Sequence, residues 1–173
     1  GVIDKKPSSS DQVFGYPVLG SDQDLKRIRS LYDSAIIAIG QIKTAMPRIR
    51  CFDHLCQLGY HLPILVSPRA YVSPYAKIGK GTVVFHDAFI NAGAVIGENC
   101  IINTKALIEH DVKVGDHCHI STSAVLNGNV SVGRRTFVGS GVITKQSIVI
   151  GTDCVIGAGA VIKRDLTSNC LVK

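Results

Sequence analysis

The sequence contains no tryptophan and few aromatic residues of any kind, although 46% of its 173 residues are hydrophobic. The apolar content is therefore mainly aliphatic, which suits a core built from thin layers of Val, Ile and Ala. A basic surface for nucleic acid usually carries aromatic side chains among its Lys and Arg residues. The scarcity of rings leads us to expect no nucleic-acid partner.

Long apolar runs are also missing. No apolar stretch approaches the eighteen residues of a membrane-spanning helix, and residues 1–6 lack the apolar segment of a secretion signal. We therefore expect a soluble, cytoplasmic protein with no membrane partner.

The six cysteines lack the spacing of a metal site, since no pair has the C-x-x-C form. Cys100, Cys118 and Cys154 are separated by multiples of eighteen residues and share that register with Thr82 and Thr136. We interpret these three cysteines as small interior side chains rather than as ligands or disulfide partners.

A six-residue repeat dominates the rest of the sequence. Counting from Val66 to Ile162, every sixth residue is aliphatic except Thr144, and no insertion interrupts the register. No α-helix has this period, whereas one short strand and one turn together span six residues. Stacked units of this kind predict a β-helix.

A second period fixes the shape of each coil. Glycines follow an aliphatic residue every eighteen positions, at Gly79, Gly97, Gly115, Gly133 and Gly151. Three hexapeptides therefore make one triangular coil, and residues eighteen apart stack in columns. In each strand the aliphatic residue points inward and the residue before it points outward. The hand of the coil is not fixed by these periods.

The first 65 residues have a different rhythm, in which strands alternate with helices. The expected elements are a strand at Val2–Ile3, a helix over 21–32, a strand over 35–40, a helix over 41–58 and a strand over 62–66. This order predicts a small α/β domain with a parallel sheet. We therefore divide the chain into domains at residues 1–65 and 66–173.

The repeated aliphatic-Gly-x-x-small unit resembles that of the left-handed β-helix acyltransferases. Three segments resemble the bacterial sugar acetyltransferases among them, namely Ile102-Asn103-Thr104, Ile108-Glu109-His110-Asp111 and His119-Ile120-Ser121. That group contains UDP-4-amino-sugar N-acetyltransferases of the bacillosamine type and sialic acid O-acetyltransferases. The resemblance implies transfer of an acetyl group from acetyl-CoA to an amino group of a UDP-4-amino sugar. O-acetylation of sialic acid or another cell-surface sugar is the alternative.

The same resemblance makes residues 1–65 a Rossmann-like domain for a sugar nucleotide. Ligands of parallel sheets bind beyond the carboxyl ends of the strands, where Asp4 and Gly40 are expected. With Lys5, these two are the expected substrate-binding residues of the domain. The similar proteins have a further strand and a Gly-rich phosphate-binding turn before the segment that Gly1 begins. We therefore expect the domain to be incomplete at its N-terminal end.

His110 carries the expected chemistry. It occupies the third place of its hexapeptide, near a corner and facing outward, and its column neighbours Ala92 and Gly128 leave space beside it. A carboxylate bonded to an imidazole fixes its tautomer and raises its basicity. By resemblance His110 is the general base, Asp111 is that carboxylate, and the Gly128 amide stabilises the thioester oxyanion. No Ser or Cys lies beside His110 in the repeat, so we expect direct transfer without an acyl-enzyme.

Further roles also come from the resemblance. Asn103 is expected to contact the sugar acceptor group, and His119, Ser140 and Ala158 are expected to contact acetyl-CoA. Residues 128–173 hold six Lys and Arg residues against two Asp residues. This excess suits a small polyanion such as coenzyme A, or is an ordinary solvated surface.

Two columns of outward apolar residues suggest how the chain assembles. One consists of Tyr71, Phe89, Leu107, Val125, Ile143 and Val161, and the other of Val83, Ile101, His119, Phe137 and Val155. Two different apolar stripes on a narrow prism predict a heterologous contact that closes into a ring, most simply a homotrimer. His119 is then expected at a subunit interface.

The histidines and threonines also bear on other classes of β-helix protein. The γ-type carbonic anhydrases hold zinc with three histidines, two of them five residues apart on one coil. His110, His117 and His119 do not have that spacing, so we expect no metal. A non-catalytic β-helix subunit remains an alternative, whereas ice binding would require outward threonines and the Thr column here points inward.

Overall fold

The computed structural model describes residues 1–4 and 12–173. These residues form two compact units. The first contains Gly1–Ala35 and Asp53–Leu62, and the second contains Ile36–Phe52 and Pro63–Lys173. The segment 36–52, which the sequence suggested for the first domain, thus groups with the repeats.

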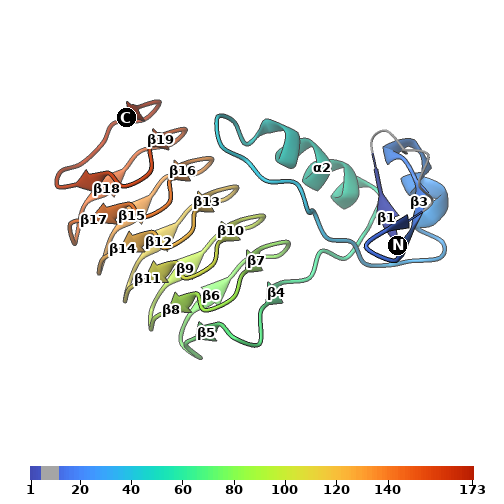
Figure 1. The fold of residues 1–173 in the computed structure, drawn as a ribbon, viewed down its shortest axis with the longest axis horizontal. Helices are drawn as coiled ribbons and strands as arrows, with labels where there is room; N and C mark the ends of the chain where they lie inside the picture. The colour runs from blue at the N-terminus through green and yellow to red at the C-terminus, as the bar shows by residue number, and fades with distance from the viewer. Residues whose placement is uncertain (5–11) are drawn as a thin grey trace. The chain divides into compact units, whose positions relative to one another are not determined.

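The second unit contains a parallel β-helix of two-residue strands, as the repeat predicts (Figure 1). Its first face contains β4 (Leu65–Val66), β7 (Val83–Val84), β10 (Ile101–Ile102), β13 (His119–Ile120), β16 (Phe137–Val138), β19 (Val155–Ile156) and β21 (Leu171–Val172). The second face contains β5 (Tyr71–Val72), β8 (Phe89–Ile90), β11 (Leu107–Ile108), β14 (Val125–Leu126), β17 (Ile143–Thr144) and β20 (Val161–Ile162). The third face contains β6 (Lys77–Ile78), β9 (Val95–Ile96), β12 (Lys113–Val114), β15 (Ser131–Val132) and β18 (Val149–Ile150).

The three corners of the prism are named by the faces they join. The first corner leads from the first face to the second and includes residues 103–105 and 121–123. The second corner leads from the second face to the third and includes residues 109–111 and 127–129. The third corner leads back to the first face. Neighbouring strands pair residues eighteen apart, as Ile101 pairs with His119 and Leu107 with Val125. The predicted columns are therefore real contacts.

The interior consists of the predicted aliphatic column and a second column of small residues. Ile90, Ile102 and Ile108 are fully buried. In the second column, Cys100 Sγ donates a hydrogen bond to the Gly115 carbonyl over 3.2 Å, and Thr82 Oγ1 donates to the equivalent Gly97 carbonyl over 2.8 Å. Burial raises the pKa of Cys100 to about 12. The interpretation of the inward cysteines as interior side chains is confirmed.

The first unit has a small sheet in the order β1-β3-β2, built from β1 (Val2–Ile3), β2 (Gln12–Val13) and β3 (Tyr16–Gly20). β1 and β3 are parallel, and β2 and β3 form an antiparallel hairpin. The single-turn η1 (Asp22–Asp24) and α1 (Leu25–Ile28) follow. Ser21 caps η1 as predicted, because its Oγ accepts from the Gln23 N–H over 3.4 Å and its backbone N–H donates to Asp24 Oδ2 over 2.9 Å. The helix ends before the expected Tyr32, because the chain turns tightly where Ser30 Oγ bonds the Arg27 carbonyl.

The expected strand over 35–40 is wrong. Residues 36–40 form no strand, because the Ile37 and Ile39 carbonyls accept hydrogen bonds from the Arg48 guanidinium instead of from a neighbouring strand. The next helix, α2 (Met46–Gln57), starts five residues later than the predicted 41. Pro47 lies in its first turn, where its missing N–H costs nothing, and Gly59 follows its end with a φ of 76°.

Candidate functional site

His110 lies at the second corner, directly after β11. Its ring Nδ1 is 3.0 Å from Asp111 Oδ2, and its side chain is 62% exposed. Hydrogen bonds between coils hold the corner, because the Asp111 N–H donates to the Ala92 carbonyl and the Asn129 N–H donates to the His110 carbonyl. Asp111 adopts a left-handed φ of 60°, which the turn requires. The predicted His–carboxylate pair is therefore formed.

Gly128 lies against the imidazole of His110. A Cβ atom at residue 128 would be 2.5 Å from Nε2 and 2.7 Å from Cε1 of that ring. Any larger residue would push the ring away from its present position. The predicted stacking of Gly128 on His110 is confirmed, while the oxyanion role of its amide stays a prediction.

An open hollow of about 620 Å³ surrounds this pair. Its lining residues come from three successive coils and are Glu109, His110, Asn127, Gly128, Lys145 and Gln146. Glu109 is held by Asn91, whose Nδ2 donates to Oε2 over 2.9 Å, and Asn127 Nδ2 donates to the Thr144 carbonyl. Asn127, Lys145 and Gln146 are not among the predicted site residues, although Lys145 belongs to the basic excess of residues 128–173. Extending the columns of Glu109 and His110 by one and two coils would have identified them.

Asn103 and His119 meet at the first corner. Asn103 Nδ2 is 3.2 Å from His119 Nε2, and the other ring nitrogen, Nδ1, is 2.8 Å from the Gln41 carbonyl oxygen. Because a carbonyl only accepts, the proton of His119 is on Nδ1. Burial is the main cause of the lowered pKa of His119, because it disfavours the charged ring.

The first stripe of outward residues is exposed or partly exposed throughout, but part of the second is buried. Ile101 is 7% and His119 is 8% exposed in the single chain, where Gln41 contacts His119. The chain itself therefore covers most of these two side chains, and their place at a subunit interface stays a prediction. The segment 36–45, which the sequence places in the α/β domain, belongs instead to the same unit as the β-helix.

The expected cofactor residues share the first corner. Ser140 and Ala158 are exposed in later coils than Asn103, and Ser140 Oγ is 2.9 Å from Ser121 Oγ. The structure thus brings Asn103, His119, Ser140 and Ala158 to one corner. It places His110, Asp111 and Gly128 at the other end of the second face, beyond the two residues of β11.

The expected sugar-nucleotide residues that the structure describes belong to different units. Asp4 is exposed after β1, with its N–H on the Gly20 carbonyl, and Lys5 lies outside the described residues. Gly40 is exposed in the irregular segment, so its predicted place at a strand end is wrong. It directly precedes Gln41 and therefore lies next to the contact with His119.

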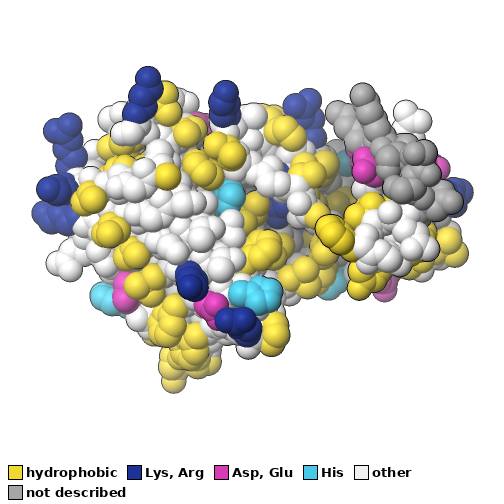
Figure 2. Space-filling model, in the orientation of Figure 1, with side chains coloured by type: hydrophobic (Ala, Val, Ile, Leu, Met, Phe, Trp, Pro, Cys, Tyr) yellow, Lys and Arg dark blue, Asp and Glu magenta, His cyan; other side chains and the backbone are white. Residues whose placement is uncertain are grey.

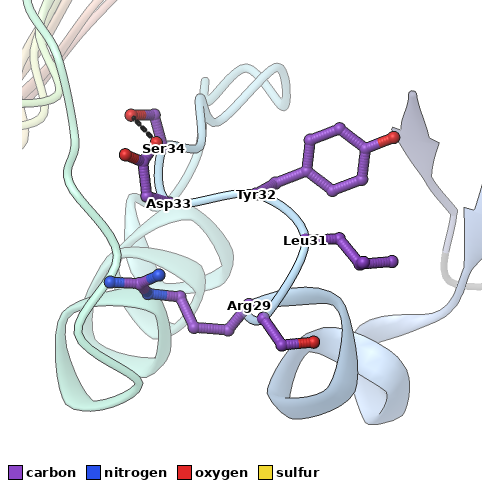
Figure 3. A pocket seen from close by; sticks show the side chains of 6 residues that line it. Arg29, Leu31, Tyr32, Asp33 and Ser34 are labelled. Carbon is purple, nitrogen blue, oxygen red and sulfur yellow. Dashed lines mark hydrogen bonds between the residues drawn. The ribbon is translucent and has the colours of Figure 1, made fainter.

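A second hollow, of about 400 Å³, belongs to the first unit and is lined by residues 29–34 (Figure 3). Arg29 Nε donates to the Gly59 carbonyl and the guanidinium carbon is 5.6 Å from the centre of the Tyr60 ring. Ser34 Oγ donates to Asp33 Oδ1. None of the predicted site residues that the structure describes lines this hollow, so we do not assign it to the acetyl-transfer site.

Charge is distributed unevenly over the second unit. Figure 2 shows Lys and Arg side chains over the coils nearest the C-terminus. On the second corner, Lys145 is followed one coil later by Lys163 and Arg164, all exposed. The basic residues therefore continue the column that starts at the His110 hollow.

Two further observations concern metals and membranes. Within residues 1–4 and 12–173, no group of three or more His, Cys, Asp or Glu side chains is arranged to hold a metal ion. In the same residues, no helix has the length and apolar character needed to cross a bilayer.

Two family models match the repeats. The model described as bacterial transferase hexapeptide (six repeats) matches residues 93–128, and the model described as hexapeptide repeat of succinyl-transferase matches residues 129–164. No curated protein sequence matches the chain.

Solved structures match nearly the whole chain. The acetyltransferase domain of PglB from Neisseria gonorrhoeae, in complex with acetyl coenzyme A, is 31% identical over 98% of this chain and 81% of that one, with a TM-score of 0.90. A His-to-Asn variant of perosamine N-acetyltransferase from Caulobacter crescentus, in complex with CoA and GDP-perosamine, is 35% identical over 98% of this chain and 79% of that one, with a TM-score of 0.92. WeeI from Acinetobacter baumannii, at 24% identity and a TM-score of 0.89, supports the fold alone.

These matches span both units, so they support the small N-terminal domain as well as the repeats. The hand of the β-helix, which the sequence periods left open, is the left hand of the hexapeptide acetyltransferases. The identity to perosamine N-acetyltransferase over most of both chains extends this likeness beyond the repeats. The chain belongs to the hexapeptide-repeat sugar acetyltransferases.

Proposed function

We propose that the protein transfers the acetyl group of acetyl-CoA to an amino group of a nucleotide-linked sugar. The observation that carries this proposal is the His110–Asp111 pair, which lies against Gly128 in an open hollow. The solved relatives support it, because one is a perosamine N-acetyltransferase with CoA and GDP-perosamine and another holds acetyl coenzyme A. We propose a UDP-4-amino sugar as the acceptor, and a sialic acid hydroxyl as the alternative.

In the proposed mechanism His110 is the general base. The Nδ1–H of His110 donates to Asp111, so Nε2 has a free lone pair. Nε2 takes a proton from the sugar amine as the amine nitrogen attacks the thioester carbonyl. The new bond is C–N, the bond that breaks is C–S, and the proton on His110 passes to the departing CoA sulfur. The backbone N–H of Gly128 is proposed to stabilise the negative charge on the carbonyl oxygen.

We further propose a homotrimer in which the second face meets a neighbour. Large apolar side chains stay exposed along this face, with Tyr71 at 50%, Phe89 at 40% and Ile143 at 44%. The face is bordered by both corners that carry site residues. A neighbouring chain that covers the second face therefore reaches both corners. This supports a site shared between the His110 corner of one chain and the Asn103 corner of another. The first unit, with Asp4, is proposed to bind the nucleotide.

Release of free CoA tests the proposed activity directly. The purified protein would be given acetyl-CoA with a UDP-4-amino sugar, a GDP-4-amino sugar or sialic acid in parallel. We expect CoA release with one of the 4-amino sugars and an N-acetyl product by mass spectrometry. Release with sialic acid alone would favour the O-acetyl alternative. Release with none of the three would contradict the proposal.

A further inference from the structure

One buried arginine fastens the segment 37–41 to the β-helix. Arg48, on α2, is 1% exposed, and its N–H groups donate to the backbone carbonyls of Ile37 at 2.6 Å, Ile39 at 2.9 Å, Asn99 at 3.3 Å and Gly81 at 3.4 Å. The first two carbonyls belong to the segment and the other two to the β-helix. Burial lowers the pKa of Arg48 to about 10, so it remains a charged donor at neutral pH.

Gln41 lies at the end of this segment and is fixed from two sides. Its backbone oxygen is 2.8 Å from His119 Nδ1, and its side-chain Nε2 donates to the His117 carbonyl over 2.8 Å. The residue is only 5% exposed. Its Oε1 has no hydrogen-bond partner among the described residues, so only one half of the amide is used. The Gln41 carbonyl is therefore held in place by the bond of its own side chain to the β-helix and, through Ile37 and Ile39, by Arg48.

Both ring nitrogens of His119 are occupied as a result. Nδ1–H donates to Gln41, and the lone pair of Nε2 accepts from Asn103 Nδ2. Asn103 Oδ1 in turn accepts from the Thr104 N–H over 2.8 Å. Buried and fully bonded, His119 is not available for proton transfer. Its contact directs the Asn103 Nδ2 group toward Nε2, while Oδ1 faces Thr104. One Nδ2–H of the amide is left for a ligand.

We propose that Arg48 and Gln41 are positioning residues of the acetyl-transfer site, which hold His119 with its proton on Nδ1 and thereby orient the Asn103 amide toward the sugar acceptor. The assignment of the His119 tautomer does not depend on the proposed function, whereas the role of Asn103 rests on the proposed function. The segment that supplies these contacts belongs to neither the repeat nor the His110 corner.

Nitrogen-15 NMR of the histidine rings in the unmodified protein tests the first half without any activity measurement. We expect His119 to show a protonated Nδ1 and an unprotonated Nε2, unchanged between about pH 6.5 and pH 8, around the ordinary pKa of histidine. A proton on Nε2, or averaging between the two tautomers, would overturn the inference. If the purified protein showed no acetyl transfer, only the proposed function would be overturned, because the NMR spectrum would still identify the tautomer.

Arg48→Met tests the second half, with Arg50→Met on the exposed side of the same helix as its matched control. We expect Arg48→Met to lower kcat/KM for the sugar by about 10- to 100-fold, the effect of a small misplacement, with little change in KM for acetyl-CoA. Arg48→Lys should recover part of the loss, and Arg50→Met should match the unmodified protein.

Gln41→Leu provides a second route if Arg48→Met does not fold, since it removes only the side-chain bond to His117. It should mix the His119 tautomers and lower kcat/KM for the sugar, by less than Arg48→Met. A folded variant of either kind with altered tautomers and unchanged kcat/KM would overturn the positioning role.

Discussion

The first and second corners of the β-helix use histidine in opposite ways. At the second corner His110 is exposed, bonds one carboxylate and keeps Nε2 open to the hollow. At the first corner His119 is buried and both ring nitrogens are bonded. The two residues also occupy different places in the repeat, because His110 follows its strand in a turn whereas His119 lies within β13. The difference therefore reflects both the place in the repeat and the contact of the segment 36–45 with His119.

The largest effect should come from breaking the open corner. His110→Ala removes the proposed base, and we expect kcat to fall by about 10² to 10⁴-fold while the β-helix stays folded. Steady-state CoA release measures the loss. His54→Ala, an exposed histidine on α2, is the control. Turnover near that of the unmodified protein would show that another group takes the proton.

The face between the corners is the next target. Leu107→Glu would place a charge in each proposed subunit contact, at a cost of several kcal/mol if it is buried unpaired. We expect a folded monomer or weakened trimer, with loss of acetyl transfer because the corners of two chains no longer meet. Sedimentation at micromolar concentration measures the assembly. Lys113→Glu, on the third face, should leave it unchanged.

A stable, active trimer of Leu107→Glu would contradict the assembly proposal. It would place the second face outside the interface. The site would then lie within one chain, at the His110 corner alone.

Filling the space beside His110 should have a moderate effect. Gly128→Ala would put a methyl group 2.5 Å from His110 Nε2 in the present structure, so the ring must move. We expect kcat to fall by about 10- to 100-fold. If this acts through His110, the double variant with His110→Ala should be no worse than His110→Ala alone. Additive losses would indicate a separate role for Gly128.

Asp111→Asn should have a smaller effect. Asn tolerates the left-handed φ of 60° and still offers an oxygen to Nδ1, so the ring position should survive. We expect kcat to fall by no more than about 10-fold, because the imidazolium that forms during transfer loses an anionic neighbour. Steady-state CoA release measures the loss, and a loss as large as that of His110→Ala would contradict a secondary role for the Asp111 charge.

The smallest effect concerns stability and pH. Because burial lowers the pKa of His119 in the folded protein, the unfolded chain binds more protons below about pH 6.5, and the free energy of unfolding should decrease as the pH falls through that range. Urea unfolding at several pH values measures this slope. His119→Phe should reduce this slope relative to the unmodified protein. An unchanged slope in His119→Phe would contradict the burial of His119 at the first corner.

The sequence predicted the open corner better than the covered one, for a physical reason. Strand pairing forces residues eighteen apart into contact, so the meeting of His110 and Gly128 follows from counting. The contact of Gln41 with His119 joins segments that share no period, and nothing in either segment indicates it. The burial of Arg48 could not be predicted for the same reason, because burial of a charged residue depends on carbonyls from distant parts of the chain.

The apolar run at 35–40 shows the other limit. Its composition suits a buried strand, and short apolar runs cannot be assigned by periodicity alone. In the structure Ile37 is buried while Ile36 and Ile39 are exposed, and Arg48 takes the carbonyls that a strand would have paired. The start of the first helix was predictable because the Ser21 cap is local. Its end was not, because a tight turn replaced further helix.

The stacking of coils also sets fixed distances between residues along the second corner. Each coil advances by one strand spacing, so the three steps from His110 to Arg164 cover about 14 Å. A ligand that reacts at His110 and places an anionic group on Arg164 must have about that length between the two groups. Deleting one coil would shorten the distance between His110 and Arg164 by about 5 Å without disturbing the strand register, and would favour a shorter ligand.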